Sequence, residues 1–294
     1  MKILLRYSWV GKFLKLLEER SVTCVESTYN SRFGPISYLH FRKNVFDTQK
    51  TIVFLHGFGN DSLFPHAQLF TRLIDLGFNI VTSDLPGHGQ GEHSTFEPDS
   101  FADFYNDLAQ ELTTKLHDLE KWHAMGYSIG ACASADFALK NPSYLDSCCF
   151  LSMPVKLPTG IPIYAELLSP LHKGFRESYN MYGLIGSIPA IGSFRRNEFP
   201  IRIKNAKFSD HFSIAKSAIE SLQLTDRIKD LTLRSICITG SLDKIAPMEF
   251  LRQTAANSKL IQLHEMPREN HYTPLFSDQV FLKITDFYKS NQQS

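Results

Sequence analysis

A serine in the pattern Gly-x-Ser-x-Gly, residues 126–130, is the first candidate for chemistry in this chain. A buried strand is predicted directly before it, over 122–126, and a helix directly after it, over 129–140. A sharp turn between a strand and a helix pushes the serine side chain away from the backbone, and flanking glycines prevent clashes at such a turn. The helix N-terminus also directs its N–H groups to this point, where a negative charge could develop. The pattern therefore predicts a nucleophile, Ser128.

A serine nucleophile needs a base, and the base needs an acid that orients it. Asp243 and His271 follow Ser128 along the chain, each in a loop after a predicted strand, 233–239 and 260–264 respectively. Loops at the carboxyl ends of parallel strands share one edge of the sheet, so the three side chains are expected to converge. We predict a catalytic triad of Ser128, Asp243 and His271.

Two backbone amides would complete such a site. Residues 51–55 predict a buried strand that ends in a His-Gly turn. In a hydrolase this turn lets a backbone N–H face the nucleophile, so the amides of Phe58 and Ile129 are the predicted oxyanion hole.

Other polar residues are weaker candidates. His264 is an alternative base, but it lies within a predicted strand, and Asp84 is an alternative acid, but it precedes the serine. His56, His88 and His93 do not have the spacing of a metal site, and the chain has no dinucleotide-binding or P-loop glycine pattern. We therefore expect no metal and no cofactor.

The elements that would position these residues alternate along the chain. The strands are short apolar runs, several without polar alternation, as in strands buried on both faces. The predicted strands are residues 36–41, 51–55, 78–83, 122–126, 145–151, 233–239 and 260–264, and the predicted helices are residues 62–76, 100–119, 129–140, 247–256 and 275–290. This alternation indicates an α/β protein with a mostly parallel sheet flanked by helices.

The alternation breaks over residues 153–211. Prolines, glycines and many apolar or aromatic side chains favour short, interrupted helices or loops there. We interpret this segment as a cap or lid inserted into the core, with an ordered surface excursion as the alternative. The rest of the chain after the N-terminus, 21–152 and 212–294, is assigned to one core because no linker or repeat divides it.

Residues 1–20 predict an amphipathic helix. Apolar side chains such as Val10 and Leu17 fall on one stripe, and Lys12 and Lys15 fall on the opposite one. We expect this helix to pack against the body of the protein or a partner subunit. A peripheral contact with a membrane surface is the alternative. The oligomeric state is left open.

Composition excludes several classes of protein. The chain has 31 Lys and Arg against 30 Asp and Glu, so no strong field would attract nucleic acid. A small, uncharged or weakly charged molecule is the expected partner. None of its apolar stretches is as long as the roughly 20 residues of a membrane-spanning helix. The 5 cysteines have no C-x-x-C spacing and lie mostly in apolar runs, which favours a reducing, cytoplasmic location.

Taken in order, these motifs resemble the signature of the α/β-hydrolase superfamily. The resemblance covers roughly residues 36–288 and is carried by residues 56–59, 84–89, 126–130, 240–243 and His271. Within the superfamily, 56–62 and 87–90 are similar to the monoacylglycerol lipase and lysophospholipase branch. That branch usually has Ser at the position of Gly91.

The resemblance implies an α/β-hydrolase fold, with a mostly parallel eight-stranded sheet, a cap after the sixth strand, and serine ester hydrolysis without a cofactor. At the nucleophile position the chain has Ser128 and not a carboxylate, which disfavours dehalogenase and epoxide hydrolase chemistry. It does not have a cysteine there either, which disfavours dienelactone-hydrolase-like chemistry. The apolar lid predicts a small apolar or lipid-like ester as substrate. A thioesterase, an acyltransferase or a C–C bond hydrolase would use the same triad. A non-catalytic binding protein of this fold is the remaining alternative.

Overall fold

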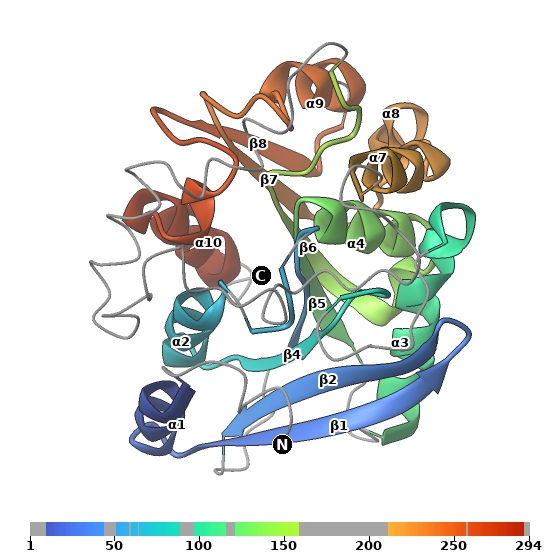
Figure 1. Cartoon of the computed structure of the whole chain (residues 1–294). Coiled ribbons are helices and arrows are strands. Elements are labelled where there is room, and N and C mark those ends of the chain that lie inside the picture. Colours follow the sequence, from blue (N-terminus) through green and yellow to red (C-terminus); the bar gives the residue numbers. More distant parts are fainter. Residues whose placement is uncertain are drawn as a thin grey trace.

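The computed structural model shows one eight-stranded sheet with helices on both faces (Figure 1). It describes residues 10–43, 51–58, 60–63, 65–88, 97–115, 121–158, 211–256 and 258–290. The strands are β1 (Val22–Ser31), β2 (Gly34–Lys43), β3 (Thr51–Leu55), β4 (Asn79–Ser83), β5 (Trp122–Tyr127), β6 (Leu145–Leu151), β7 (Ser235–Gly240) and β8 (Ile261–Met266). They lie in the order β1-β2-β4-β3-β5-β6-β7-β8. Pairing is antiparallel between β1 and β2 and between β2 and β4, and parallel elsewhere.

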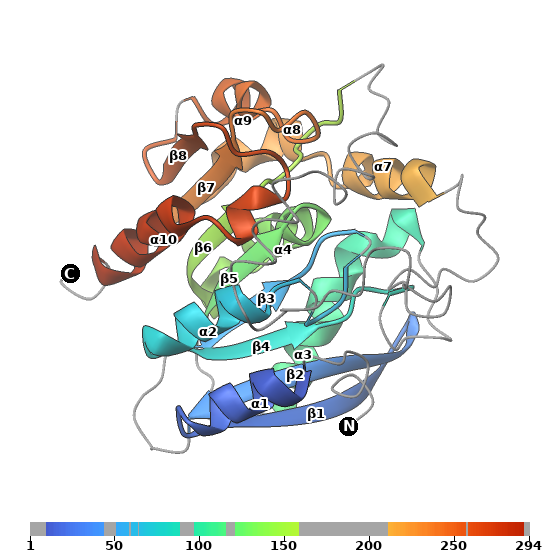
Figure 2. The ribbon, with the colours of Figure 1, turned by 60° about the vertical axis from the view of Figure 1, so that its left-hand side comes forward.

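The helices form a layer on each side of this sheet (Figures 1 and 2). One layer contains α1 (Val10–Glu18), α2 (Ala67–Asp75) and α10 (Asp278–Ser290), and the other contains α3 (Phe104–Lys115), α4 (Ile129–Lys140), α8 (Leu224–Arg227) and α9 (Met248–Ala255). A further helix, α7 (His211–Ser221), lies against the short 3-10 helix η1 (Pro98–Asp103). The other short helices are η2 (Pro142–Tyr144), η6 (Ile228–Asp230) and η7 (Thr273–Leu275).

Each face of the sheet has its own hydrophobic core. In β3, Val53 and Leu55 pack into one core while Ile52 and Phe54 pack into the other, because successive side chains of a strand point to opposite faces. All four are fully buried. The unbroken apolar run in the sequence reflects this burial on both sides. The predicted α/β-hydrolase fold class is confirmed.

Some predicted elements differ in extent. The helix predicted over 62–76 begins only at Ala67, and the N–H groups of Ser62 and Leu63, which precede it, are bonded to the carboxylates of Asp84 and Asp61. The helix predicted over 100–119 is divided into η1 and α3. Most of the predicted cap, residues 159–210, lies outside the described residues.

The N-terminal helix packs against the body of the protein. Val10, Phe13 and Leu17 are buried, and the ring of Phe13 meets that of Phe41 with the centroids 5.8 Å apart. Arg20, just after the helix, forms an ion pair with Asp75 at 2.7 Å. The apolar stripe of α1 is therefore an internal contact. A membrane contact of residues 1–20 stays a prediction. None of the helices in the described ranges is long and apolar enough to cross a membrane.

Candidate active site

Ser128 lies at a strained turn between β5 and α4. Its φ of 54° and ψ of −124° are unusual for a residue with a side chain, and such conformations are concentrated at functional sites. The turn is held from both sides. The N–H of Ser128 donates to the carbonyl of Leu151 in β6 at 2.9 Å, and its carbonyl accepts the N–H of Ala131 in the first turn of α4 at 2.9 Å. The sharp strand-to-helix turn expected from the sequence is present.

Two glycines allow this turn because the backbone comes too close for a side chain. A Cβ on Gly126 would lie 2.4 Å from the carbonyl oxygen of Gly130. A Cβ on Gly130 would lie 2.3 Å from the carbonyl oxygen of Leu55, in β3. Both neighbours are backbone atoms of the central sheet or of α4, so they cannot move aside easily. The two glycines therefore set the position of Ser128 against the sheet.

We predict that Gly130→Ala lowers the free energy of unfolding in urea by about 3 kcal/mol, because the new methyl group overpacks a rigid backbone contact. Gly11→Ala in α1 is the matched control, since nothing lies within 4 Å of a Cβ there. That control should gain roughly 0.5–1 kcal/mol from the helix propensity of alanine. Equal stability of the two variants would contradict the close approach at Gly130.

The side chain of His271 connects the other two predicted residues. Its Nε2 lies 3.0 Å from Oγ of Ser128, and its Nδ1 lies 3.0 and 2.9 Å from the two carboxylate oxygens of Asp243. All three residues are buried, and the loops that carry them follow β5, β7 and β8 at one edge of the sheet. An ionised carboxylate only accepts hydrogen bonds, so Nδ1 carries the proton and Nε2 offers a lone pair to the serine hydroxyl.

The carboxylate of Asp243 has a dense set of donors. Oδ1 accepts the N–H groups of Ile245 and Ala246 at 2.9 and 2.8 Å, and Oδ2 accepts the hydroxyl of Thr239 at 3.0 Å. Burial acts to raise the pKa of Asp243, but the neighbouring His271, which bonds the carboxylate, and the hydrogen bonds from Ala246 and Thr239 together act more strongly in the opposite direction. The pKa is therefore lower than that of an ordinary aspartate, and the group is ionised at neutral pH.

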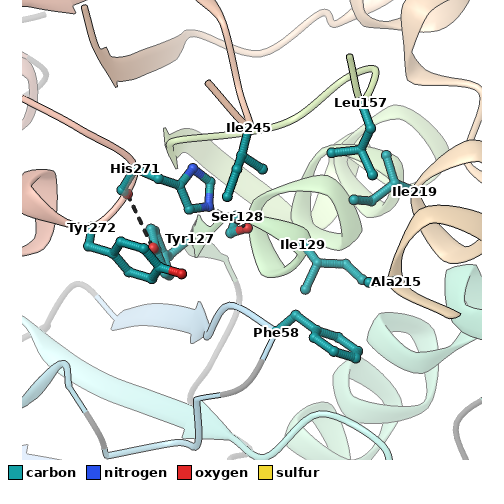
Figure 3. Close-up of a pocket in the computed structure, with 10 residues that line it drawn as sticks. All are labelled: Phe58, Tyr127, Ser128, Ile129, Leu157, Ala215, Ile219, Ile245, His271 and Tyr272. Atoms are coloured by element: carbon teal, nitrogen blue, oxygen red, sulfur yellow. Dashed lines mark hydrogen bonds between the residues drawn. The ribbon is translucent and has the colours of Figure 1, made fainter. Parts of the chain in front are cut away.

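An apolar pocket opens above Ser128 (Figure 3). The two residues predicted for the oxyanion hole, Phe58 and Ile129, lie in its wall, and Ile129 is the first residue of α4. The described residues that line it are Phe58, Tyr127, Ser128, Ile129, Leu157, Ala215, Ile219, Ile245, His271 and Tyr272. The arrangement places a hydroxyl with an adjacent base at the floor of a cavity with mainly apolar walls.

The alternative candidates have other contacts. Asp84 is fully buried and accepts the N–H of Ser62 at 2.8 Å. Both ring nitrogens of His56 are bonded: Nδ1 donates to the carbonyl of Gly57 and Nε2 accepts the N–H of Leu85, each at 2.8 Å. His264 lies within β8, as expected, and burial is the main cause that lowers its pKa. Within the described ranges, His, Cys, Asp and Glu side chains form no group of three that could hold a metal ion.

Part of the pocket comes from residues that sequence reasoning did not single out. Ala215 and Ile219 belong to α7, which was not predicted. A signal for this helix exists, because Ala215, Ala218, Ile219 and Leu222 recur at helical spacing and all are buried. The hydroxyl of Thr239, which donates to Asp243, has no such signal, because a threonine at the end of a buried strand is an ordinary strand residue.

The chain resembles known proteins over parts of its length or most of it. A family model described as alpha/beta hydrolase fold matches residues 50–178. A 2-hydroxy-6-oxononadienedioate/2-hydroxy-6-oxononatrienedioate hydrolase from Comamonas testosteroni is 22% identical, covering 74% of this chain and 79% of the relative. An ethanol acetyltransferase from Hanseniaspora uvarum is 30% identical, but the match covers only 47% of this chain and 40% of the relative.

The structural comparison agrees with the fold. The crystal structure of a bacterial membrane phospholipase A superposes with a TM-score of 0.66 and 14% identity, covering 97% of this chain and 92% of that one. These three proteins are named for three different reactions, so the comparisons identify the fold and leave the reaction open. The strand order, the turn at Ser128 and these matches together show that the chain has the α/β-hydrolase fold.

Proposed function

We propose that the protein is a serine hydrolase that cleaves carboxylic esters of small apolar or lipid-like molecules. One observation carries the proposal: Oγ of Ser128 lies 3.0 Å from Nε2 of His271 at the floor of an apolar pocket. The nucleophile and its base are within hydrogen-bond reach, and the base is in turn oriented by Asp243.

The geometry supports a two-step mechanism. His271 takes the proton of Ser128 as Oγ attacks the acyl carbonyl, and Asp243 stabilises the imidazolium that forms. The backbone N–H groups of Phe58 and Ile129 stabilise the oxyanion of the tetrahedral intermediate. His271 then protonates the leaving alcohol, which leaves an acyl group on Ser128. Water, activated by the same histidine, releases the acid and restores the serine.

The pocket favours an uncharged acyl group. None of the described residues around it is Lys, Arg, Asp or Glu, and most of the walls are aliphatic or aromatic. A substrate with a free carboxylate would lose its hydration there without gaining a cation from the described lining. The Comamonas relative is named for dicarboxylate substrates, which fit the described lining less well than an apolar ester does.

A series of p-nitrophenyl esters tests the proposal. From acetate to butyrate we expect kcat/KM to rise by on the order of tenfold, because each buried CH2 contributes about 0.8 kcal/mol. The hemisuccinate is the matched control, since its acyl chain has the length of butyrate but ends in a carboxylate, and it should be a poor substrate. A preference for acetate alone would contradict an apolar acyl pocket. Activity confined to thioesters, to transfer onto an added alcohol, or to C–C bonds would identify another reaction of the triad.

A further inference from the structure

The backbone carbonyl of His271 accepts two side-chain hydroxyl groups. Tyr127 donates to it at 3.1 Å and Ser152 donates to it at 3.0 Å. Figure 3 shows the bond from Tyr127. The two donors come from the ends of neighbouring strands, β5 and β6, whereas His271 follows β8. The carbonyl of His271 thus accepts two hydrogen bonds from the end of the central sheet, which uses both of its lone pairs. The ring of the same residue is the proposed base.

The two donors are themselves firmly held. The ring of Tyr127 meets the His271 ring with the centroids 5.4 Å apart, and it lies so close to Gly57 that a Cβ there would be 2.6 Å from it. Ser152 is fully buried, and its N–H donates to the carbonyl of Ile238 in β7 at 2.8 Å. Burial also raises the pKa of Tyr127, so its hydroxyl stays protonated and remains a donor.

Ser152 has a backbone conformation that needs an explanation. Its φ is 47°, in the left-handed region that residues with a Cβ rarely adopt. Strain of this kind persists where the surrounding structure demands it, and it is concentrated at functional sites. The reaction steps above make no use of Ser152. Its hydroxyl bond to His271 is the described contact that links this strained residue to the site.

The base lies on a loop that needs outside support. Residues 267–272 connect β8 to η7 without regular structure. Locally, the side chain of Asn270 accepts the N–H groups of Tyr272 and Thr273, and the carbonyl of Glu269 accepts the N–H of Leu242. None of these bonds reaches β5, the strand that carries the nucleophile. The hydroxyl bond from Tyr127 does, because Tyr127 immediately precedes Ser128, and the bond from Ser152 reaches the end of the neighbouring strand β6.

We infer that Tyr127 and Ser152 are positioning residues that fix the backbone of His271, and so hold Nε2 in line with Oγ of Ser128. The inference rests on the proposed function, in which His271 is the base. When one hydroxyl is removed, the other still holds the carbonyl by one hydrogen bond, so the two residues act redundantly. A shift of the catalytic group by about 1 Å can cost on the order of a hundredfold in rate, and loss of both bonds permits such a shift.

The test compares Tyr127→Phe, Ser152→Ala and the double variant, with p-nitrophenyl butyrate as substrate. We expect each single variant to lower kcat by roughly threefold and the double variant by roughly a hundredfold, with KM unchanged, because the two residues share one partner. Inactivation by a fluorophosphonate should slow in parallel with kcat, since both reactions need the base. The control is the double variant Tyr105→Phe with Ser134→Ala, which removes a buried tyrosine hydroxyl and a buried serine hydroxyl elsewhere in the core.

The outcomes separate positioning from general stability. A double variant that keeps wild-type kcat, or one that loses no more than the control, overturns the inference. If the wild type hydrolyses no ester and is not labelled, the proposed function has failed. In that case, crystal structures of the wild type and of the Tyr127→Phe, Ser152→Ala variant test the inference without an activity assay. An Nε2–Oγ distance lengthened beyond hydrogen-bond range supports it, and an unchanged distance overturns it.

Discussion

Ser128→Ala is expected to lower kcat for ester hydrolysis by on the order of a millionfold and to abolish labelling by a fluorophosphonate. The reason is chemical, because Oγ is the atom that attacks the acyl carbonyl and alanine has no replacement for it. The fold should be unaffected. Alanine has the same Cβ as serine at this strained φ, and the serine hydroxyl bonds to His271 and not to the backbone of the turn.

The control for this variant is Ser134→Ala, which removes a buried hydroxyl from α4, the helix that follows Ser128. That hydroxyl lies 3.5 Å from the carbonyl of Met125. Turnover by each variant is measured with p-nitrophenyl butyrate at matched concentrations of folded protein, checked by thermal unfolding. The Ser134 variant should be labelled and active like the wild type. If Ser128→Ala remains labelled, the labelled nucleophile is another residue and the proposed mechanism is wrong.

Asp243→Asn should lower kcat by on the order of ten thousandfold. The asparagine oxygen will occupy the position of Oδ1, because two backbone N–H groups, from Ile245 and Ala246, donate to that position. Its NH2 group then replaces Oδ2, 2.9 Å from Nδ1 of His271. An amide N–H donates to Nδ1, so the ring proton moves to Nε2. Such a histidine cannot accept the proton of Ser128.

Asp136→Asn is the matched control for this effect. Asp136 is another buried carboxylate, on α4, and it pairs with Arg227 at 2.6 Å and with Lys140 at 2.7 Å, away from the site. Its loss should lower thermal stability and leave kcat unchanged. Nuclear magnetic resonance of the ring nitrogens of His271 would report the tautomer directly. A ring still protonated at Nδ1 in Asp243→Asn would show that the variant acts by some other route.

The sequence predicts the nucleophile well because its signals are local. The glycines at 126 and 130, the buried run before Ser128 and the helix after it all lie within about 20 residues, and the required turn allows few alternatives. Asp243 and His271 could be predicted because each follows a strand of the same parallel sheet. The structure brings the three side chains within hydrogen-bond distance.

Features that depend on distant contacts could not be predicted in this way. The strand β1 was missed because it lies at the edge of the sheet and alternates exposed and partly buried polar residues, so it has no apolar run. The carbonyl of His271 is bonded to two residues that are distant in sequence: Ser152 lies 119 positions before it and Tyr127 lies 144 positions before it. No sequence pattern marks either residue. Only the folded sheet brings these hydroxyls together.

The order of the strands also has a consequence during protein synthesis. Ser128 and its turn are built from β3, β5 and β6, which leave the ribosome early, whereas His271 follows β8 and lies 143 residues after the serine. At roughly 5–20 residues per second, translation separates the two by about 7–30 s. A nascent chain therefore has its nucleophile without a base. In the proposed mechanism hydrolysis needs both residues, so an unfinished chain should hydrolyse nothing until the C-terminal strands join the sheet.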